Sequence, residues 1–444
     1  MTTAVETLPR IQSGPDQRAV LPWMVTGLLL WGAFTLRVPG LLLLGYLVCL
    51  VGLAERALIT FRVHAAGLLV LANYGVWMLS GVVTGGVEWR DFVSPAFYNN
   101  DGRVFLYYLP LLFFASSTAT ARDVLWSVRA VCQVAVVGVL LMIPWAVASP
   151  SWLSVGSKAW YGGLLTSHTG AGTFFGVLAA WLLTYGDVSG SRHHRIAGVL
   201  CAVPMFASGS RQALLSLLAV FAWYVVRTGR RVVILRAGAA VLGLVAVLSL
   251  TVPRLVERTA VLFSPDTYGA IADVAARSNW EPSIGEPLGG VESNILSRIV
   301  LWKYAARRFA ESPLLGIGFG RYNDQGVRTE SAGLAAFATE GDRLTNVYNA
   351  HNMYLHVLAE NGVFGLALLL GLWGILWREM SLGARGSPAS LRPFFTAGQA
   401  ALVFTAVSAC FDNALASPSL GLPVLGLVGL GIAFRRGQSR ESTI

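Results

Sequence analysis

Charged side chains are scarce in this sequence. Only 13% of its 444 residues are charged and 55% are apolar, whereas a soluble globular protein carries about 25% charged residues. This composition excludes an ordinary soluble domain. It indicates that much of the chain is surrounded by lipid.

Cysteine is also scarce, and its positions exclude two kinds of small scaffold. All four cysteines, Cys49, Cys132, Cys201 and Cys410, fall inside apolar runs. No disulfide framework or zinc-binding spacing can be drawn from them. The N-terminus also lacks the charged region, short apolar core and small-residue cleavage site of a signal peptide, so we expect the first apolar helix to target the chain.

Apolar runs bounded by charged residues, glycine and proline recur along most of the chain. Several exceed the roughly 17 residues that a helix needs to cross a bilayer. They predict twelve transmembrane helices near residues 21–36, 38–54, 63–86, 104–119, 128–149, 163–185, 195–208, 211–227, 231–252, 351–377, 394–411 and 418–434. The seventh and eighth spans are short, and the segment between them is compatible with either a turn or a kink.

The distribution of basic residues predicts the orientation of these helices. If the N-terminus is cytoplasmic, 18 of the 33 Lys and Arg residues fall in cytoplasmic segments and only 5 in short external loops. Cytoplasmic loops are enriched in positive charge, and one helix more or fewer would destroy this segregation. We therefore expect both termini to be cytoplasmic. The net charge of +10 then reflects membrane orientation, and we expect no nucleic-acid partner.

The predicted fold is an all-α polytopic membrane protein with about twelve transmembrane helices and one large, mainly helical extracytoplasmic loop. Residues 1–252 would carry the first nine helices, residues 253–350 the loop, residues 351–434 the last three helices and residues 435–444 a cytoplasmic tail. The loop holds the other ten basic residues and is too long for a simple helix connection, so we expect it to carry structure and function of its own.

Within this loop, apolar residues recur with helical spacing over residues 293–311. They predict an amphipathic helix that Ser293 caps and Pro313 terminates. The preceding segment, 264–292, is rich in proline, glycine, serine and acidic residues, and its composition predicts irregular chain.

Two arginines occupy positions where they could bind an anion. Arg211 follows a small-residue turn at the outer end of a helix, and it could either extend to the interface or bind phosphate from within the bundle. Arg298 adjoins the apolar stripe of the predicted loop helix, as either a solvated charge or an anion ligand. The later glycines at 316, 318 and 320 lack the βαβ context of a nucleotide-binding loop and predict a turn back toward the membrane.

Two histidines also stand out. His351 lies where the long outer loop re-enters the bilayer, so it could meet both a membrane-held donor and an external acceptor. A metal pair with His356 is disfavoured because a five-residue offset places the two rings about 140° apart on a helix, whereas His356 and Glu360 share a face. His168 interrupts an apolar span, where it could line a cavity or bond a neighbouring helix.

Together, these segments resemble the O-antigen ligase and polymerase superfamily of bacterial membrane glycan transferases. The resemblance covers about residues 205–375. It rests on three segments in order, namely Gly209-Ser210-Arg211, then Arg298 with Trp302 ahead of Ser312-Pro313-Leu314-Leu315-Gly316-Ile317-Gly318, and finally His351-Asn352-Met353-Tyr354-Leu355 through Glu360-Asn361-Gly362 to Gly365. The last segment is the most specific.

The resemblance implies a membrane glycosyltransferase of the bacterial cytoplasmic (inner) membrane, with its active site on the extracytoplasmic side. Such an enzyme would transfer a glycan from undecaprenyl pyrophosphate to a hydroxyl of an acceptor such as lipid A-core, without a metal or other cofactor. By motif, His351 would be the essential imidazole, and Arg211 and Arg298 would bind the pyrophosphate. Arg321, Asn352 and His168 are candidates for further substrate contacts.

The chemistry of these side chains agrees with that assignment. Guanidinium groups can stabilise the charge that develops on a departing pyrophosphate, and an imidazole can accept the proton of the attacking hydroxyl. A single displacement would invert the anomeric configuration. If His351 is not the base, the loop carboxylates Asp324, Glu340 and Asp342 are the next candidates.

Two other functions stay open. A polymerase of the same superfamily would share the motifs. We favour the ligase because the resemblance is strongest in the region after which that family is named and because one long loop precedes His351. A transporter or flippase for lipid-linked sugars would also need many helices and cationic side chains along a cavity, but it would not need a proton-accepting histidine at the outer interface.

Overall fold

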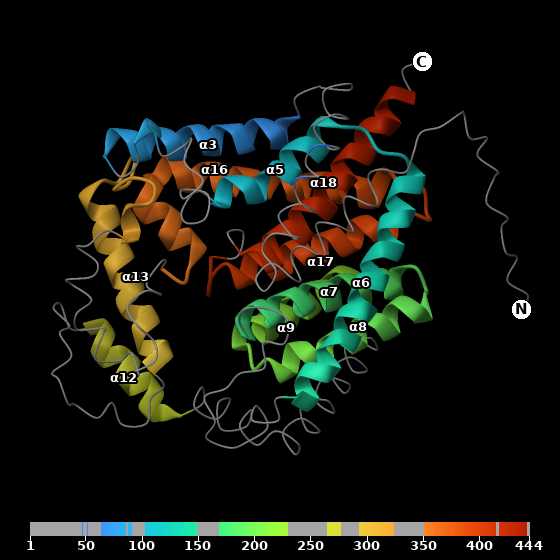
Figure 1. Ribbon diagram of the computed structural model, residues 1–444, viewed down its shortest axis with the longest axis horizontal. Helices are drawn as coiled ribbons and strands as arrows, with labels where there is room; N and C mark the ends of the chain where they lie inside the picture. Colours follow the sequence, from blue (N-terminus) through green and yellow to red (C-terminus); the bar gives the residue numbers. More distant parts are fainter. Residues whose placement is uncertain are drawn as a thin grey trace, which may run out of the picture.

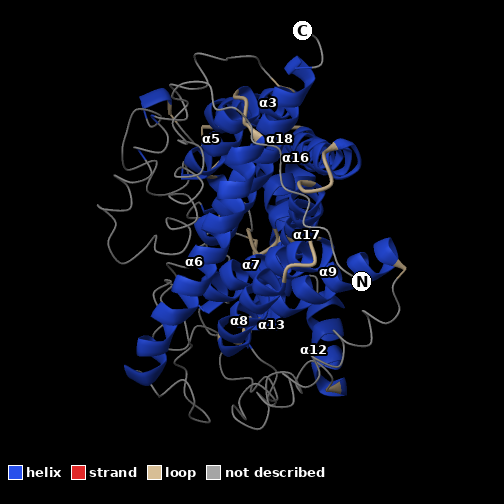
Figure 2. Cartoon of the chain, turned by 90° about the vertical axis from the view of Figure 1, so that its right-hand side faces the viewer, coloured by secondary structure: helices blue, strands red, loops and turns tan. Residues whose placement is uncertain are grey.

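The computed structural model describes residues 47, 51, 64–85, 88–90, 103–148, 168–229, 264–276, 293–323, 350–413 and 417–441. Every regular element in these ranges is a helix (Figure 2). The helices are α3 (Ala65–Val83), α5 (Arg103–Ser116), α6 (Ala121–Ala148), α7 (His168–Val188), α8 (Arg192–Ala207), α9 (Arg211–Thr228), α12 (Pro265–Ala276), α13 (Ser293–Glu311), the 3-10 helix η3 (Arg321–Asn323), α16 (Met353–Gly386), α17 (Arg392–Ser408) and α18 (Pro418–Glu441).

Within the described ranges, five helices contain a stretch long and apolar enough to cross a membrane. These stretches are Ala65–Val83, Ala121–Met142, Thr169–Val188, Met353–Gly386 and Ser419–Gln438. The described part of the chain is therefore a helical membrane protein. The predicted spans near 21–36 and 231–252 lie outside the described residues, as does the span near 38–54 apart from residues 47 and 51.

The ends of several helices follow from local sequence. Thr120 and Asp123 form a reciprocal capping box at the start of α6, in which Thr120 N–H donates to Asp123 Oδ2 over 2.9 Å and Asp123 N–H donates to Thr120 Oγ1 over 3.3 Å. Ser210 caps α9, and Gly229 ends it with a φ of +62° that glycine adopts without strain. The residues before and after these apolar runs thus determine where the helices start and stop.

The segment between the predicted seventh and eighth spans is a turn. Ser208 caps the end of α8, and Gly209 follows it with a φ of +66°. Helices α8 and α9 are therefore separate and are joined by Ser208–Ser210. A β-carbon added to Gly172 of α7 would lie 2.3 Å from Ser210 Cβ. Only glycine at 172 lets α7 pass this close to the turn.

Helix α7 lies inside the bundle. It packs against α8, α9 and α17, and its residues from Ala171 to Leu182 are buried (Figure 1). Small residues allow the close approach, since a β-carbon added to Gly176 would lie 2.6 Å from Phe404 Cζ and one added to Gly198 would lie 2.8 Å from Leu183 Cγ. This packing joins α7, α8 and α17 into the core.

Helices α12 and α13 lie at one end of the bundle, on the left of Figure 1, and α13 packs against α16. The predicted amphipathic helix at 293–311 is confirmed as α13, which ends two residues before Pro313. Ser293, predicted as its cap, is the first residue of the helix. The prediction that residues 264–292 are irregular is wrong for their first part, which forms α12. Pro265 at the first helical position fixes φ without losing a needed hydrogen bond, and the alanines at 270, 272, 275 and 276 favour helix.

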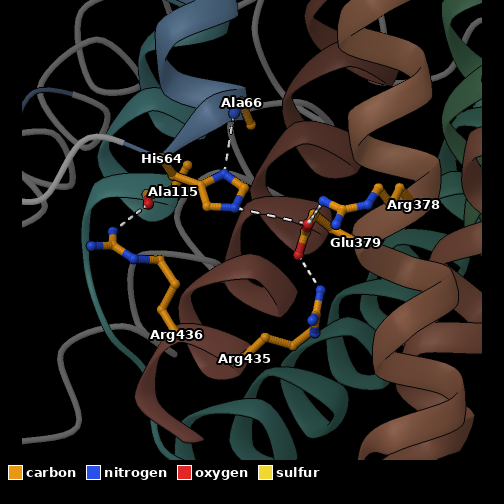
Figure 3. A network of polar contacts seen from close by, with 7 residues as sticks. All are labelled: His64, Ala66, Ala115, Arg378, Glu379, Arg435 and Arg436. Atoms are coloured by element: carbon orange, nitrogen blue, oxygen red, sulfur yellow. Dashed lines mark hydrogen bonds and ion pairs between the residues drawn. The ribbon is translucent and has the colours of Figure 1, made fainter. Parts of the chain in front are cut away.

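A polar network joins four helix ends around the buried Glu379 of α16 (Figure 3). Arg435 of α18 forms an ion pair with Glu379, and His64, which caps α3, has its Nε2 3.9 Å from Glu379 Oε1. Arg436 donates to the carbonyl of Ala115 at the end of α5. The start of α3 and the ends of α5, α16 and α18 therefore lie together.

Candidate active site

His351 has an unusual backbone conformation at the opposite end of α16 from Glu379. Its φ is +45°, which makes it the only residue other than glycine with a positive φ in the described ranges. Asn352 follows it and caps α16, with Oδ1 accepting from Leu355 N–H over 3.1 Å. The cap and the left-handed residue before it turn the chain sharply, and the His351 side chain is 36% exposed at that corner.

Two hydrogen bonds attach the start of α16 to the end of α17. Met353 N–H donates to the Ala409 carbonyl over 2.8 Å, and Tyr354 Oη donates to the Ala406 carbonyl over 3.0 Å. As a result, the turn after α17 lies beside His351, with His351 Nδ1 3.6 Å from Asp412 Oδ1. At this distance the two atoms are close enough for an ion pair but too far apart for a hydrogen bond.

Asp412 also contacts two other segments. Its Oδ1 accepts from Asn413 N–H over 2.8 Å, and its Oδ2 lies 3.5 Å from Nε2 of the buried Gln212, the second residue of α9. Burial raises the pKa of Asp412. His351, the Asn413 N–H and the nearby charge of Arg298 lower it by more than burial raises it, so the pKa of Asp412 lies below its ordinary value. Asp412 is therefore a persistent negative charge among groups from α9, α13 and α16.

The two predicted pyrophosphate ligands converge on the same region from different helices. Arg211 is the first residue of α9 and precedes Gln212, so it stands at the positive end of the helix dipole. Arg298 lies in the first half of α13, half-buried, and its charge acts on Asp412. The structure thus places His351 and the charge of Arg298 near Asp412, and Arg211 directly before Gln212, which contacts Asp412, although these residues lie far apart in the sequence.

The glycine-containing segment after α13 is docked into a break in α16. Gly362 has non-helical angles (φ +62°, ψ −162°), so the helix hydrogen bonds are interrupted there. The neighbouring loop replaces them, because Gly318 N–H donates to the Glu360 carbonyl over 2.9 Å and Val363 N–H donates to the Pro313 carbonyl over 2.9 Å. The glycines at 316 and 318 therefore allow this segment to pack closely against its neighbours. Their positive φ values are consistent with the predicted turn.

An aromatic cluster holds the same segment against α3 and α5. The ring of Phe319 stacks on Trp77 at 5.8 Å between centroids and meets Phe105 edge-on at 5.5 Å. Ser80 of α3 donates to Asn361 Oδ1 over 2.9 Å and accepts from the Phe319 N–H. The position of the loop after α13 is consequently fixed from two sides.

The predicted pairing of His356 with Glu360 is confirmed. His356 Nε2 lies 3.5 Å from Glu360 Oε2, and Glu360 Oε1 accepts from Tyr322 N–H over 3.1 Å. Tyr322 in turn donates its hydroxyl to the Leu301 carbonyl over 2.8 Å, one helical turn from Arg298. This chain of contacts fixes α13 relative to α16. It therefore also fixes Arg298, on α13, relative to His351 at the start of α16.

The other predicted contacts have the following positions. Asn352 uses its side-chain oxygen as the helix cap, and Arg321 Nη1 donates to the Thr84 carbonyl at the end of α3 over 2.6 Å. His168 is the first residue of α7. The alternative bases Asp324, Glu340 and Asp342 lie outside the described residues. Among the described residues, no group of three or more His, Cys, Asp and Glu side chains could hold a metal ion.

Asp412 is the site residue that the sequence analysis missed. A usable signal was present, because Asp412 comes directly after the apolar run 394–411, in the same kind of interfacial position that drew attention to His351. An acidic residue at the outer edge of a span is a functional candidate in its own right.

The described helices define a helical membrane protein with a polar site at one end. In this site a histidine and an arginine act on an aspartate, and a second arginine begins the helix whose next residue contacts that aspartate. Residues 196–370 match the family model described as O-antigen ligase. This match supports membership of the O-antigen ligase superfamily. No curated protein matches the chain.

Proposed function

We propose that this protein is an O-antigen ligase-type glycosyltransferase that moves a glycan from undecaprenyl pyrophosphate to a hydroxyl of lipid A-core, on the outer face of the cytoplasmic membrane. One observation carries the proposal. The family match over residues 196–370 contains His351 and Arg298, which act on Asp412, and Arg211, which directly precedes the Asp412 contact Gln212. Membership of the family supports a ligase or polymerase acting on lipid-linked glycans.

In the proposed reaction, the acceptor oxygen attacks the anomeric carbon of the donor glycan. The new carbon–oxygen bond forms as the bond to the pyrophosphate oxygen breaks, and the bonding electrons leave with the lipid pyrophosphate. Arg211 and Arg298 stabilise that charge, and His351 Nε2 accepts the hydroxyl proton. One displacement inverts the anomeric configuration. Arg321, Asn352 and His168 are proposed as further substrate contacts.

The proposed topology has twelve spans, with a cytoplasmic N-terminus, an outer loop at 253–350 and a cytoplasmic tail, and the ends of the described helices are arranged as its orientation requires. The start of α3 and the ends of α5, α16 and α18 meet around Glu379, and the basic-residue distribution assigns all four to the cytoplasm (Figure 3). His351, Asp412 and the start of α9 meet at the other end, which that distribution assigns to the outside.

The length of α16 is compatible with this orientation. His351 and Glu379 are separated by 28 positions, which along a helix correspond to about 40 Å. This is close to the thickness of a bilayer including its interfacial regions. The site and the Glu379 network would therefore lie at opposite membrane surfaces.

The proposal is tested by transfer with purified full-length protein. Donor and lipid A-core extracted from the source cells are incubated with the protein without ATP or an ion gradient, and the product is identified by mass spectrometry. We expect glycan joined covalently to lipid A-core with inverted configuration. Extension of the glycan on its lipid would instead identify a polymerase, and movement of intact donor across vesicles without transfer would identify a transporter.

The arginine assignment is tested with conservative variants. Arg211→Lys and Arg298→Lys keep the charge but lose the two-pronged geometry, so we expect donor binding or turnover to fall, and to fall further in the Ala variants. Arg90→Ala is the matched control, since its guanidinium pairs with Glu88 at an exposed surface. Wild-type donor affinity and transfer rate in both Ala variants would contradict the assignment.

A further inference from the structure

Two helices carry a tryptophan followed by an arginine where they end, at the side of the bundle that holds Glu379. On α9, Arg227 comes four positions after Trp223, and on α16, Arg385 comes eight positions after Trp377. Residues four and eight positions apart share a helix face, so on each helix both side chains lie on one face with the arginine nearer the end.

The two tryptophans bring these faces together. The rings of Trp223 and Trp377 meet edge-on at 5.9 Å between centroids, and the guanidinium of Arg227 lies over the Trp223 ring at 5.4 Å. Trp377 is 37% exposed, and both arginines are exposed. These four side chains, the Trp–Arg patch, therefore lie together at the surface.

Helix α17 holds the two helices in this arrangement, because it packs against both α9 and α16. Its buried Gln399 accepts a hydrogen bond from Arg227 Nη1 and donates through Nε2 to Ser381 Oγ of α16 over 2.7 Å. Ser381 lies one turn before Arg385 on the same face of α16. The amide thus fixes Arg227 beside the face that carries Arg385.

The positive charge of the patch is not neutralised by any described carboxylate. Arg227 and Arg385 are close enough for their charges to repel each other. The nearby Arg378 and Arg435, by contrast, both pair with Glu379. An arginine in the last turn favours the dipole of its own helix, but this effect does not account for two of them held side by side. Two guanidinium groups in this arrangement are suited to bind an anion between them.

We propose that the Trp–Arg patch binds the headgroup phosphate of an anionic phospholipid, with the acyl chains against its tryptophans. The position of the patch favours a lipid over a soluble anion, since tryptophan and arginine at the end of a membrane helix lie at the depth of the headgroups. Val226, next to Arg227, is 84% exposed, as a side chain in contact with acyl chains would be.

The proposed orientation assigns this site to the cytoplasmic leaflet, whose anionic lipids attract basic residues. The site lies at the opposite end of α16 from His351. The inference therefore goes beyond the proposed transfer reaction and does not depend on it.

The test measures lipid binding by the full-length protein. Detergent-purified protein is titrated with phosphatidylglycerol or phosphatidylcholine, and native mass spectrometry counts the bound lipids. We expect the wild type to prefer phosphatidylglycerol. Arg227→Gln and Arg385→Gln should each lower the affinity for it about fivefold, and the double variant about 25-fold. The control pair, Arg122→Gln with Arg192→Gln, removes the same charge from exposed positions at the starts of α6 and α8 and should keep the wild-type affinity.

Arg385→Gln carries the test alone if loss of the contact between Arg227 and Gln399 prevents folding, because Arg385 forms no hydrogen bond with a described residue. Unchanged affinity in Arg385→Gln, or an equal loss in the control pair, overturns the inference. Displacement of bound phosphatidylglycerol by an equal concentration of inorganic phosphate also overturns it, since the patch would then recognise a soluble anion. Because lipid binding is measured without transfer, these outcomes leave the proposed function to its own test.

Discussion

At the scale of single residues, the site depends on a histidine in a costly conformation. A residue other than glycine with φ near +45° costs about 1–3 kcal/mol, and such strain persists only where surrounding contacts over-determine it. At His351 those contacts are the Asn352 cap and the hydrogen bonds between Met353 and Ala409 and between Tyr354 and Ala406. The imidazole is held at the corner where the loop enters the bundle.

The backbone conformation decides which variant tests catalysis most cleanly. Asparagine tolerates positive φ better than alanine, so His351→Asn removes the imidazole with little added strain. We expect transfer to fall by about 10²- to 10⁴-fold while donor binding and thermal stability stay close to wild type. His194→Asn is the control, because His194 contacts Ser191 at the start of α8 and takes no part in the proposed reaction.

The measurement is single-turnover transfer against pH, with the same protein preparations used for donor binding. Wild-type transfer should fall toward acidic pH as the base is protonated, and the residual rate of His351→Asn should lack that acidic limb. An active His351→Asn protein with the wild-type pH profile would remove His351 as the base.

At the scale of elements, the break in α16 determines where α13 sits. Gly362 has angles that only glycine adopts readily, and a β-carbon at this position would lie 2.2 Å from the Leu314 carbonyl oxygen. The hydrogen bonds across the break attach the segment after α13, and through it Arg298 is fixed relative to His351. The Glu-Asn-Gly motif is therefore a docking site for the segment after α13.

This arrangement predicts contrasting effects of two glycine substitutions in one helix. Gly362→Ala adds both backbone strain and a clash with backbone atoms. We therefore expect it to destabilise the protein by about 1–3 kcal/mol or more and to lower the transfer rate. Gly374→Ala is the matched control, because a β-carbon there meets no atom within 4 Å and alanine favours helix. Thermal unfolding in detergent measures both, and equal melting temperatures would contradict the docking role.

At the scale of the whole molecule, the topology predicts which surfaces an external reagent can reach. Tyr268 is exposed on α12 and His193 is exposed on α8. A cysteine replacing Tyr268 should react with a membrane-impermeant thiol reagent in intact cells, whereas one replacing His193 should react only after permeabilisation. The parent protein corrects for its native cysteines. The reverse pattern would invert the topology.

The sequence by itself determined the class of protein and the local elements. Lipid cannot satisfy backbone polar groups, so apolar runs of sufficient length must form helices, and caps such as Asn352 and Ser210 and terminators such as Pro313 act within a few residues. The apolar stripe of α13 is also a local pattern, so this helix was predictable from the sequence. In α12, by contrast, a composition typical of irregular chain concealed a helix that Pro265 starts.

Only the tertiary structure decided which polar groups meet. Gln212 and Asp412 are 200 positions apart, and no local pattern links them. They lie together because α9 packs against α17, and His351 joins them because two hydrogen bonds attach the start of α16 to the end of α17. Helix formation is governed by neighbours in sequence, whereas the pairing of Asp412 with His351 depends on how the whole bundle packs.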